Sequence, residues 1–171
     1  MTDHIHASEP LLGSLRFADG RGAVRMEDIY DTDIDDLWSA LVEPLRLARW
    51  IGSVTGDLWV GGSFRSTFTS GWEGPGRVQV CDAPRRLRVT LNPDETDEMS
   101  IEALLSVDGD KTRLVVEDSG FSRDDLAGHG AGWQAHLEDL AAYLAGREPA
   151  DWGTRWRQLS PSYDVLADGL E

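Results

Sequence analysis

The sequence predicts an α+β protein in which a curved antiparallel sheet wraps around one long helix near the C-terminus. The first observation is a segment with a clear helical period, residues 132–146. The second is a series of segments with the two-residue period of strands, which begins at residue 57. The third is that the turns between these segments are short, so consecutive strands should be antiparallel neighbours. Such a sheet has an apolar face to bury, and the long helix is the element that covers it.

The long helix has one buried face. Its apolar residues fall within a stripe about 100° wide: Trp133, Leu137, Leu140, Ala141 and Leu144. Gly146 follows the last of them, and Pro149 cannot continue a helix. The C-terminal end of the helix is therefore well defined.

The start of this helix allows two interpretations. Ser122 and Asp125 have the spacing of a capping box, but Gly128, Gly130 and Gly132 occupy the turns that follow. Each helical glycine costs about 1 kcal/mol relative to alanine. This half is therefore either frayed, or its glycines allow another backbone or a ligand to come close.

A hairpin is predicted at the N-terminal end of the domain. Residues 11–17 and 23–30 flank the turn sequence at 19–22, and apolar and polar side chains alternate in the second segment. We expect two antiparallel strands.

The acidic residues of segment 31–36 have the alternating spacing of a calcium-binding loop, but two positions of such a twelve-residue loop do not match. Asp36 stands where that loop needs glycine, and Val42 stands where it needs glutamate. The same acids are well suited to the cap and first turn of a helix. Glu43 and Pro44 end this helix, and a second short helical turn is expected at 45–51.

The strands of the main sheet are predicted at residues 58–69, 76–81, 86–91, 99–107 and 112–118. Alternation assigns these residues to the face toward the helix: Phe64, Ser66, Phe68, Val78, Val80, Leu87, Val89, Leu91, Ile101, Ala103, Leu105, Leu114 and Val116. The charged strand residues fall on the opposite face. We therefore expect no carboxylate pair facing inward.

Charge and composition limit the classes of partner. The 171 residues include 16 basic and 31 acidic side chains, for a formal charge of −15. This balance disfavours binding to nucleic acid or to an anionic membrane surface. The single cysteine, Cys81, excludes an internal disulfide framework, and no segment has the pattern of a signal peptide or of a membrane span. The expected location is the cytoplasm.

The chain divides into three parts by composition. We expect a flexible N-terminus at residues 1–10, one domain at 11–146, and a C-terminal amphipathic extension at 147–171 that packs on the domain. In the extension, Trp152, Trp156 and Leu159 have helical spacing. His4 and His6 have a spacing that could bind a metal, although a mobile terminus is the commoner role for such a segment.

Several segments resemble a known family by their order and spacing. They are residues 24–30 leading into 36–44, then 47–50, 56–64, 76–80, 83–87, 112–121 and Gly132–Trp133. Together they resemble the START-like (SRPBCC) superfamily, in its heat-shock ATPase activator-like branch, over residues 13–146. The resemblance implies a helix-grip fold with a deep, mostly apolar cavity between the sheet and the helix. The sequence departs from the family pattern at Asp118, where a histidine or other polar residue is frequent, and in the glycine-rich start of the helix.

The resemblance does not decide the function, since this superfamily has no shared catalytic residue. The first hypothesis is the binding of a small hydrophobic or aromatic molecule in the cavity. Its candidate contacts are Trp50, Trp59, Phe64, Phe68, Trp72, Val89, His129, Trp133, His136 and Leu137. For each aromatic residue, a purely structural place in the core is the alternative.

Two other hypotheses stay open. One is an enzyme of the polyketide cyclase or aromatase type, in which His129 and His136 move protons. The other is a protein-interaction or chaperone-activator-like module that uses the acidic surface and the Trp152/Trp156 helix. No nucleotide, serine-hydrolase or zinc motif occurs, so no cofactor or metal is predicted, and a second copy of the chain is a candidate partner.

Overall fold

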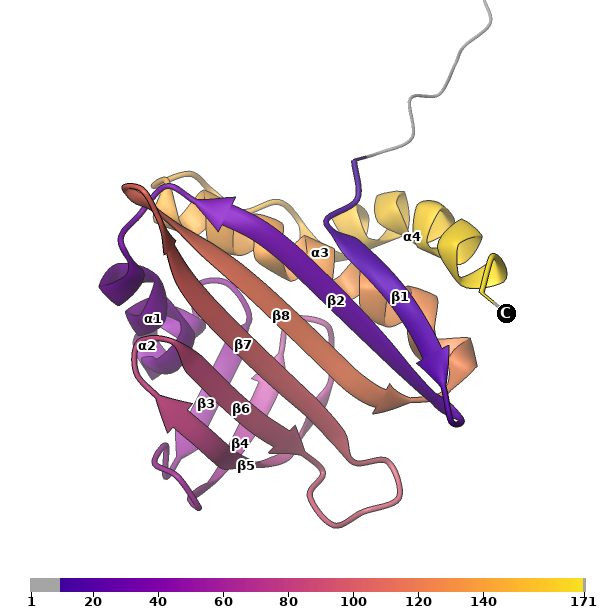
Figure 1. Cartoon of the computed structure of the whole chain (residues 1–171), viewed down its shortest axis with the longest axis horizontal. Coiled ribbons are helices and arrows are strands. Elements are labelled where there is room, and N and C mark those ends of the chain that lie inside the picture. Colours follow the sequence, from indigo (N-terminus) through magenta and orange to yellow (C-terminus); the bar gives the residue numbers. More distant parts are fainter. Residues whose placement is uncertain (1–9, 171) are drawn as a thin grey trace, which may run out of the picture.

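The computed structural model describes residues 10–170 and has the architecture that the sequence predicts. Over this range the strands form one eight-stranded antiparallel sheet in the order β1-β2-β8-β7-β6-β5-β4-β3. Figure 1 shows that the sheet is strongly curved, with α3 behind β2 and β8 and with α4 beside α3. The expectations for a flexible N-terminus and for His4 and His6 concern residues that lie, Pro10 apart, outside the described range.

The N-terminal hairpin is formed by β1 (Gly13–Ala18) and β2 (Arg21–Tyr30). Asp19 and Gly20 both have positive φ angles, 55° and 75°, as a two-residue hairpin turn requires. β2 then pairs with β8 (Lys111–Phe121), which carries the N-terminal hairpin into the main sheet. The hairpin therefore extends the sheet under the helix.

Two helices follow the hairpin, as predicted. The side chain of Asp33 caps α1 (Ile34–Val42) by accepting a 2.8 Å hydrogen bond from the Asp36 backbone. α2 (Pro44–Leu47) is shorter than the expected turn at 45–51. The acids of this segment thus serve as a helix cap and first turn.

The meander contains one strand that the sequence analysis missed. β3 (Gly52–Gly56) pairs with β4 (Ser63–Phe68) and forms the edge of the sheet. It begins and ends with glycine and lacks a repeating apolar pattern, so period alone does not reveal it. The remaining strands are β5 (Glu73–Asp82), β6 (Arg86–Leu91) and β7 (Met99–Asp108).

The predicted inward face is correct at most positions and wrong at one. The register shifts within β5 between Val78 and Val80, so Val80 lies opposite Arg88 and Cys81 lies opposite Leu87. Residues directly opposite each other share a face of the sheet. This bulge therefore turns Val80 to the side of Arg88, away from the helix, and Cys81 takes the inward position.

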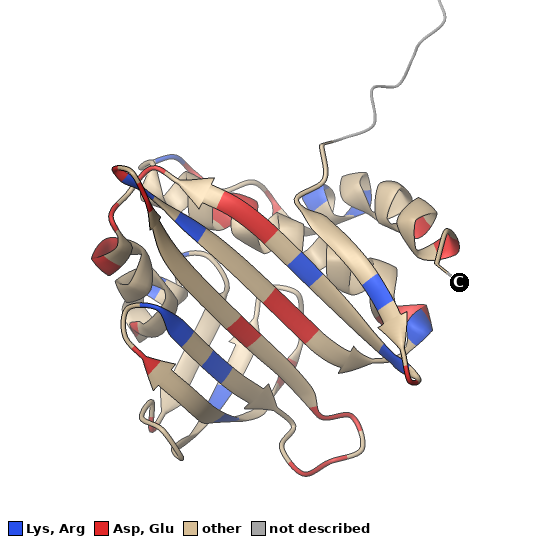
Figure 2. Cartoon of the chain, viewed as in Figure 1, with Lys and Arg blue, Asp and Glu red and all other residues tan. Residues whose placement is uncertain are grey.

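Charged residues cover the outer face of the sheet, where Figure 2 shows acidic and basic positions interleaved across the strands. Ion pairs on this face join Arg16 to Glu117, Arg86 to Glu102 and Arg113 to Glu27. These pairs are partly exposed, so each contributes at most about 1 kcal/mol to stability. The core lies on the other side of the sheet.

The helix α3 (Arg123–Leu144) lies against the inner face, and α4 (Trp152–Asp168) packs on α3. Leu126, Leu137 and Leu140 of α3 are buried, as are Leu159 and Tyr163 of α4. Within residues 10–170, no helix combines the length and the apolar character needed to cross a lipid bilayer.

Candidate ligand-binding cavity

Two adjoining cavities lie between the sheet and the helices. The larger has a volume of about 660 Å³ and the smaller about 130 Å³. Both are lined by the same five side chains, which therefore form the wall between them: Ile51, Phe68, Leu91, Ile101 and Trp133. The two cavities are thus neighbouring chambers, and together they are called the hollow.

The smaller chamber is almost wholly apolar. Apart from the shared wall, it is lined by side chains from α1, α2, the turn after α2 and strands β3 to β8, among them Trp50, Val54, Phe64, Val78 and Val89. Its polar exception is Ser66, which is 1% exposed and whose hydroxyl has no hydrogen-bond partner. This chamber fits an apolar group that carries at most one polar atom.

The larger chamber has aromatic walls. Trp72 stacks on Phe68 with ring centroids 5.3 Å apart, and Trp152 stacks on Trp156 at 6.3 Å. Trp133 faces the chamber from α3. Three tryptophans of this wall, Trp133, Trp152 and Trp156, come from helices, so the chamber depends on how α4 sits on α3.

One strand carboxylate faces inward, a single acid that the sequence analysis did not identify when it excluded an inward pair. Asp118 of β8 is 4% exposed and lines the larger chamber. Its Oδ2 accepts a 2.7 Å hydrogen bond from Nε1 of Trp133 and lies 3.4 Å from Nδ1 of His129. Alternation already points to this position, because Asp118 continues the inward series of Leu114 and Val116.

The two predicted histidines both line the larger chamber but differ in surroundings. The His129 ring stacks on Phe121, with centroids 4.0 Å apart. His136 is buried, with its ring 5.3 Å from Trp152 and 6.0 Å from Trp133. Burial lowers the pKa of His136 to about 4, against a smaller opposing effect of the Trp50 backbone. His136 is therefore neutral near pH 7.

Within residues 10–170, four buried side-chain polar atoms lack a hydrogen-bond partner. They are the Ser66 hydroxyl, Oδ1 of Asp118, Nδ1 of His136 and Nε1 of Trp152. All four residues line one of the two chambers. Buried polar atoms are nearly always hydrogen-bonded, so their concentration among the residues of these two chambers is unusual for a protein core.

The glycines at the start of α3 allow a neighbouring helix to come close. α3 is helical from residue 123 onward, so this half is not frayed. A methyl group added at Gly130 would lie 2.5 Å from the Tyr163 ring, and one at Gly132 would lie 3.3 Å from Trp152. Of the two interpretations offered by the sequence, close approach is the one the structure supports, and the approaching element is α4.

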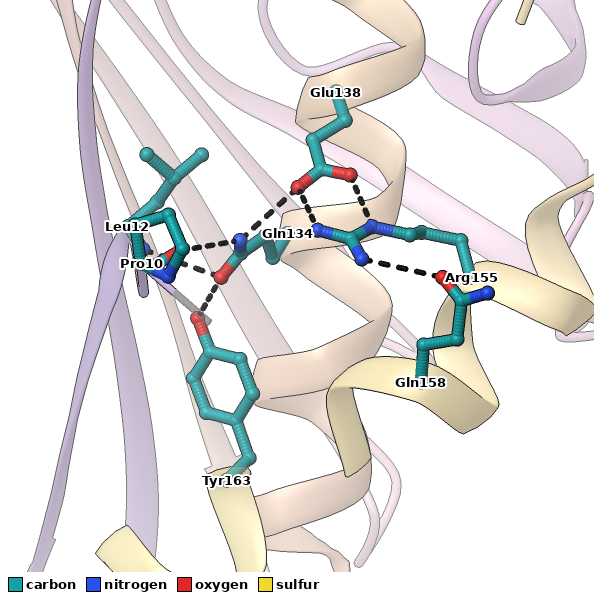
Figure 3. Close-up of polar contacts among 7 residues, drawn as sticks. All are labelled: Pro10, Leu12, Gln134, Glu138, Arg155, Gln158 and Tyr163. Atoms are coloured by element: carbon teal, nitrogen blue, oxygen red, sulfur yellow. Dashed lines mark hydrogen bonds and ion pairs between the residues drawn. The ribbon is translucent and has the colours of Figure 1, made fainter. Parts of the chain in front are cut away.

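A polar network fixes α4 in this position (Figure 3). The side chain of Gln134 donates to the Pro10 carbonyl and to Glu138, and it accepts from the Leu12 backbone and from the Tyr163 hydroxyl. Arg155 of α4 pairs with Glu138 through two nitrogens, at 2.6 and 3.0 Å. The segment just before β1, α3 and α4 are thus joined by side chains that do not line the chamber.

The structure places eight of the ten predicted contact residues on a chamber wall. Trp50, Phe64 and Val89 line the smaller chamber, Trp72, His129 and His136 line the larger, and Phe68 and Trp133 line both. Trp59 lies outside both chambers, because it falls in the loop before β4 and is 64% exposed. Leu137 is buried in the core and also lines neither.

Sequence reasoning missed Asp118 and the inward role of the α4 tryptophans. Trp152 and Trp156 line the larger chamber, and Nε1 of Trp156 donates to the Gly128 carbonyl. The glycines on α3 were the signal for this contact. No group of three or more His, Cys, Asp or Glu residues in the described part of the chain is placed to hold a metal ion.

Solved structures confirm the fold. CalU16 from Micromonospora echinospora is 24% identical, with a TM-score of 0.74 over 92% of this chain and 96% of its own. The product of gene BPP1335 from Bordetella parapertussis is 22% identical, with a TM-score of 0.70 over 91% of this chain and 92% of its own. DynU16, described as a protein in the dynemicin biosynthetic locus, is 27% identical, with a TM-score of 0.68 over 78% of this chain and 51% of its own.

No curated protein matches the sequence. The model of one family, described as "Activator of Hsp90 ATPase homolog 1-like protein", matches residues 31–145. This segment spans α1 to the end of α3 and contains every strand that lines the hollow. The chain therefore belongs to the activator of Hsp90 ATPase homolog 1-like family, within the START-like (SRPBCC) superfamily.

Proposed function

We propose that this protein binds a small, largely apolar, aromatic molecule in the two-chambered hollow between the sheet, α3 and α4. The observation that carries the proposal is that all four unpartnered buried polar atoms of the described residues belong to side chains that line this hollow. A core formed only for stability has no reason to gather such atoms, since each costs about 1–3 kcal/mol when unpaired.

Size and chemistry support the same conclusion. Sites for small molecules have volumes of about 300–1,000 Å³ and combine apolar walls with a few polar groups. The larger chamber, at about 660 Å³, falls in this range. Its stacked aromatic walls suit a flat ring system, and the narrower chamber has room for an apolar substituent.

The test places a bulky side chain in the larger chamber from its α4 wall. Ser160 of α4 lines this chamber and is partly exposed, whereas Ser162 on the same helix lines neither chamber. We expect naphthalene-based compounds to raise the melting temperature of the wild type and of Ser162→Trp, but not of Ser160→Trp. Equal stabilisation of both variants would contradict binding in the larger chamber.

A second candidate function is catalysis of the cyclase or aromatase type. The observation that favours it is a buried acid, Asp118, 3.4 Å from His129 and in the same chamber as the neutral His136. These groups can accept and return protons on a bound chain. The similarity to DynU16, a protein of a biosynthetic locus, gives this candidate additional support.

This candidate has a separate test. A synthetic poly-β-ketone thioester would be incubated with wild type, Asp118→Asn and His129→Gln, and the loss of water on ring closure would be followed by mass spectrometry. Enzymatic function predicts protein-dependent loss of water that both variants slow by at least about tenfold. Ring closure at the same rate with and without protein would leave binding as the function.

A further inference from the structure

We infer that the molecule bound in the larger chamber carries a positively charged group, such as a protonated amine, which binds at Asp118 with its apolar part between the tryptophans. This inference rests on the proposed binding function and specifies the chemical class of the ligand.

The first support is the sign of the charges around the larger chamber. The acidic residues that line it are Asp118, Asp124, Asp125 and Asp164, and no lysine or arginine of residues 10–170 lines it. Asp118 is buried, while the other three are exposed at the rim. A chamber of this kind, in a chain with a formal charge of −15, concentrates cations and repels anions.

The second support is the free oxygen of Asp118. Trp133 and His129 both lie on the side of Oδ2, and Oδ1 is buried without a partner. A carboxylate oxygen is an acceptor only, so its partner must be a donor. A cationic N–H donor offsets the cost of burying the carboxylate charge better than a neutral donor does.

The third support is the nature of the walls. Tryptophan faces attract cations, by about 0.5–2 kcal/mol when the site is partly or fully desolvated. Trp72, Trp133, Trp152 and Trp156 all line this chamber. His136 adds no competing positive charge near pH 7, since burial lowers its pKa to about 4.

The unpartnered Nε1 of Trp152 indicates a second polar group on the ligand. It is a donor without an acceptor, so the ligand should also present a neutral acceptor, such as a hydroxyl, ether or carbonyl oxygen, on the α4 side of the chamber. The ligand class is thus an aromatic molecule with a basic nitrogen and at least one oxygen.

The test uses three probes with the same ring and different charge: naphthylmethylamine, naphthylmethanol and naphthoic acid. Titrations are made by calorimetry at about pH 8, above the ordinary pKa of histidine and below that of an alkylamine. We expect the amine to bind at least about tenfold more tightly than the alcohol, and the acid to bind most weakly. An alcohol or acid that binds the wild type as tightly as the amine would overturn the inference while leaving the proposed function intact.

Matched variants locate the effect. Asp118→Asn should reduce the preference for the amine over the alcohol to about twofold or less, and Asp164→Asn should reduce it partly. Asp110→Asn removes the same charge from the exposed turn between β7 and β8 and should leave the preference unchanged. An equal loss in Asp164→Asn and Asp110→Asn would assign the preference to net charge and overturn the inference. Binding of none of the three probes by the wild type would contradict the proposed function, and the inference with it.

Discussion

Nε1 of Trp133 donates a 2.7 Å hydrogen bond to Oδ2 of Asp118 and so joins α3 to β8 in the wall of the larger chamber. The donor and the acceptor are both nearly inaccessible to solvent, with Trp133 8% and Asp118 4% exposed. This contact holds the carboxyl group in place and leaves its second oxygen without a hydrogen-bond partner.

The first prediction concerns this contact. Trp133→Phe removes the donor and leaves a buried carboxylate with one fewer partner, so the free energy of unfolding should fall by about 1–3 kcal/mol beyond the loss of packing. Urea unfolding of Trp133→Phe, Asp118→Leu and the double variant measures the coupling. The double variant should lose at least about 1 kcal/mol less than the sum of the single variants, and simple additivity would contradict the contact.

The second prediction compares two glycines of α3. Alanine is the better helix former by about 1 kcal/mol, so Gly128→Ala, where the nearest atom would be 3.7 Å from the new methyl group, should stabilise the protein. Gly130→Ala places its methyl group 2.5 Å from the buried Tyr163 ring and should destabilise it by about 1–3 kcal/mol. Thermal unfolding distinguishes the two variants. Equal melting temperatures would show that Tyr163 of α4 does not pack closely against Gly130.

The third prediction concerns the attachment of α4. The Tyr163 hydroxyl donates a 2.6 Å bond to Gln134 and accepts a 3.2 Å bond from the Gly13 backbone, so Tyr163→Phe should cost about 1–2 kcal/mol. Tyr30→Phe is the matched control, because its hydroxyl makes only a 3.4 Å contact to the Leu137 carbonyl. Chemical denaturation should show the larger loss for Tyr163→Phe, and the reverse order would contradict the network in Figure 3.

The sequence predicts most of this fold because its signals are periodic. The stripe from Trp133 to Leu144 and the alternation along β4 to β8 place the helix on the correct face of the sheet. The errors occur where the alternation of inward and outward side chains is interrupted, or where it was not followed to the end of a strand. The bulge between Val78 and Val80 moves one side chain to the other face, and β3 has too little apolar pattern to be seen.

The site is less predictable, because it depends on contacts between distant segments. The sequence identifies His129 and His136 on α3 but not the proximity of Trp152, which follows from the packing of α4. Asp118 could have been found by extending the alternation of β8 by two residues. The exposure of Trp59 could not have been found, since it depends on the path of a loop.

The fourth prediction concerns pH. His136 has a pKa of about 4 in the folded protein and about 6.5 when unfolded, so the unfolded chain binds more protons between these values. The stability that comes from its neutral form is present above about pH 6.5 and is lost as the pH falls toward 4, by on the order of 2–3 kcal/mol.

Comparison with His136→Phe isolates this effect. Asp139 also titrates in this window, because burial raises its pKa to about 6, but it is common to both proteins and cancels in their difference. The stability of wild type relative to His136→Phe should therefore decrease on acidification. Parallel stability curves from pH 7 to pH 4 would show that His136 is not buried as described.

The most direct test of ligand binding in this hollow uses the tryptophans themselves as reporters. The chain has seven, and their indole N–H signals can be followed by nuclear magnetic resonance while naphthylmethanol is added. The signals of Trp133 and Trp152, which line the larger chamber, should shift and saturate, while those of Trp38 and Trp59, which line neither, stay unchanged. Absence of a saturable shift, or a shift of Trp59 alone, would contradict binding between the sheet and the helices.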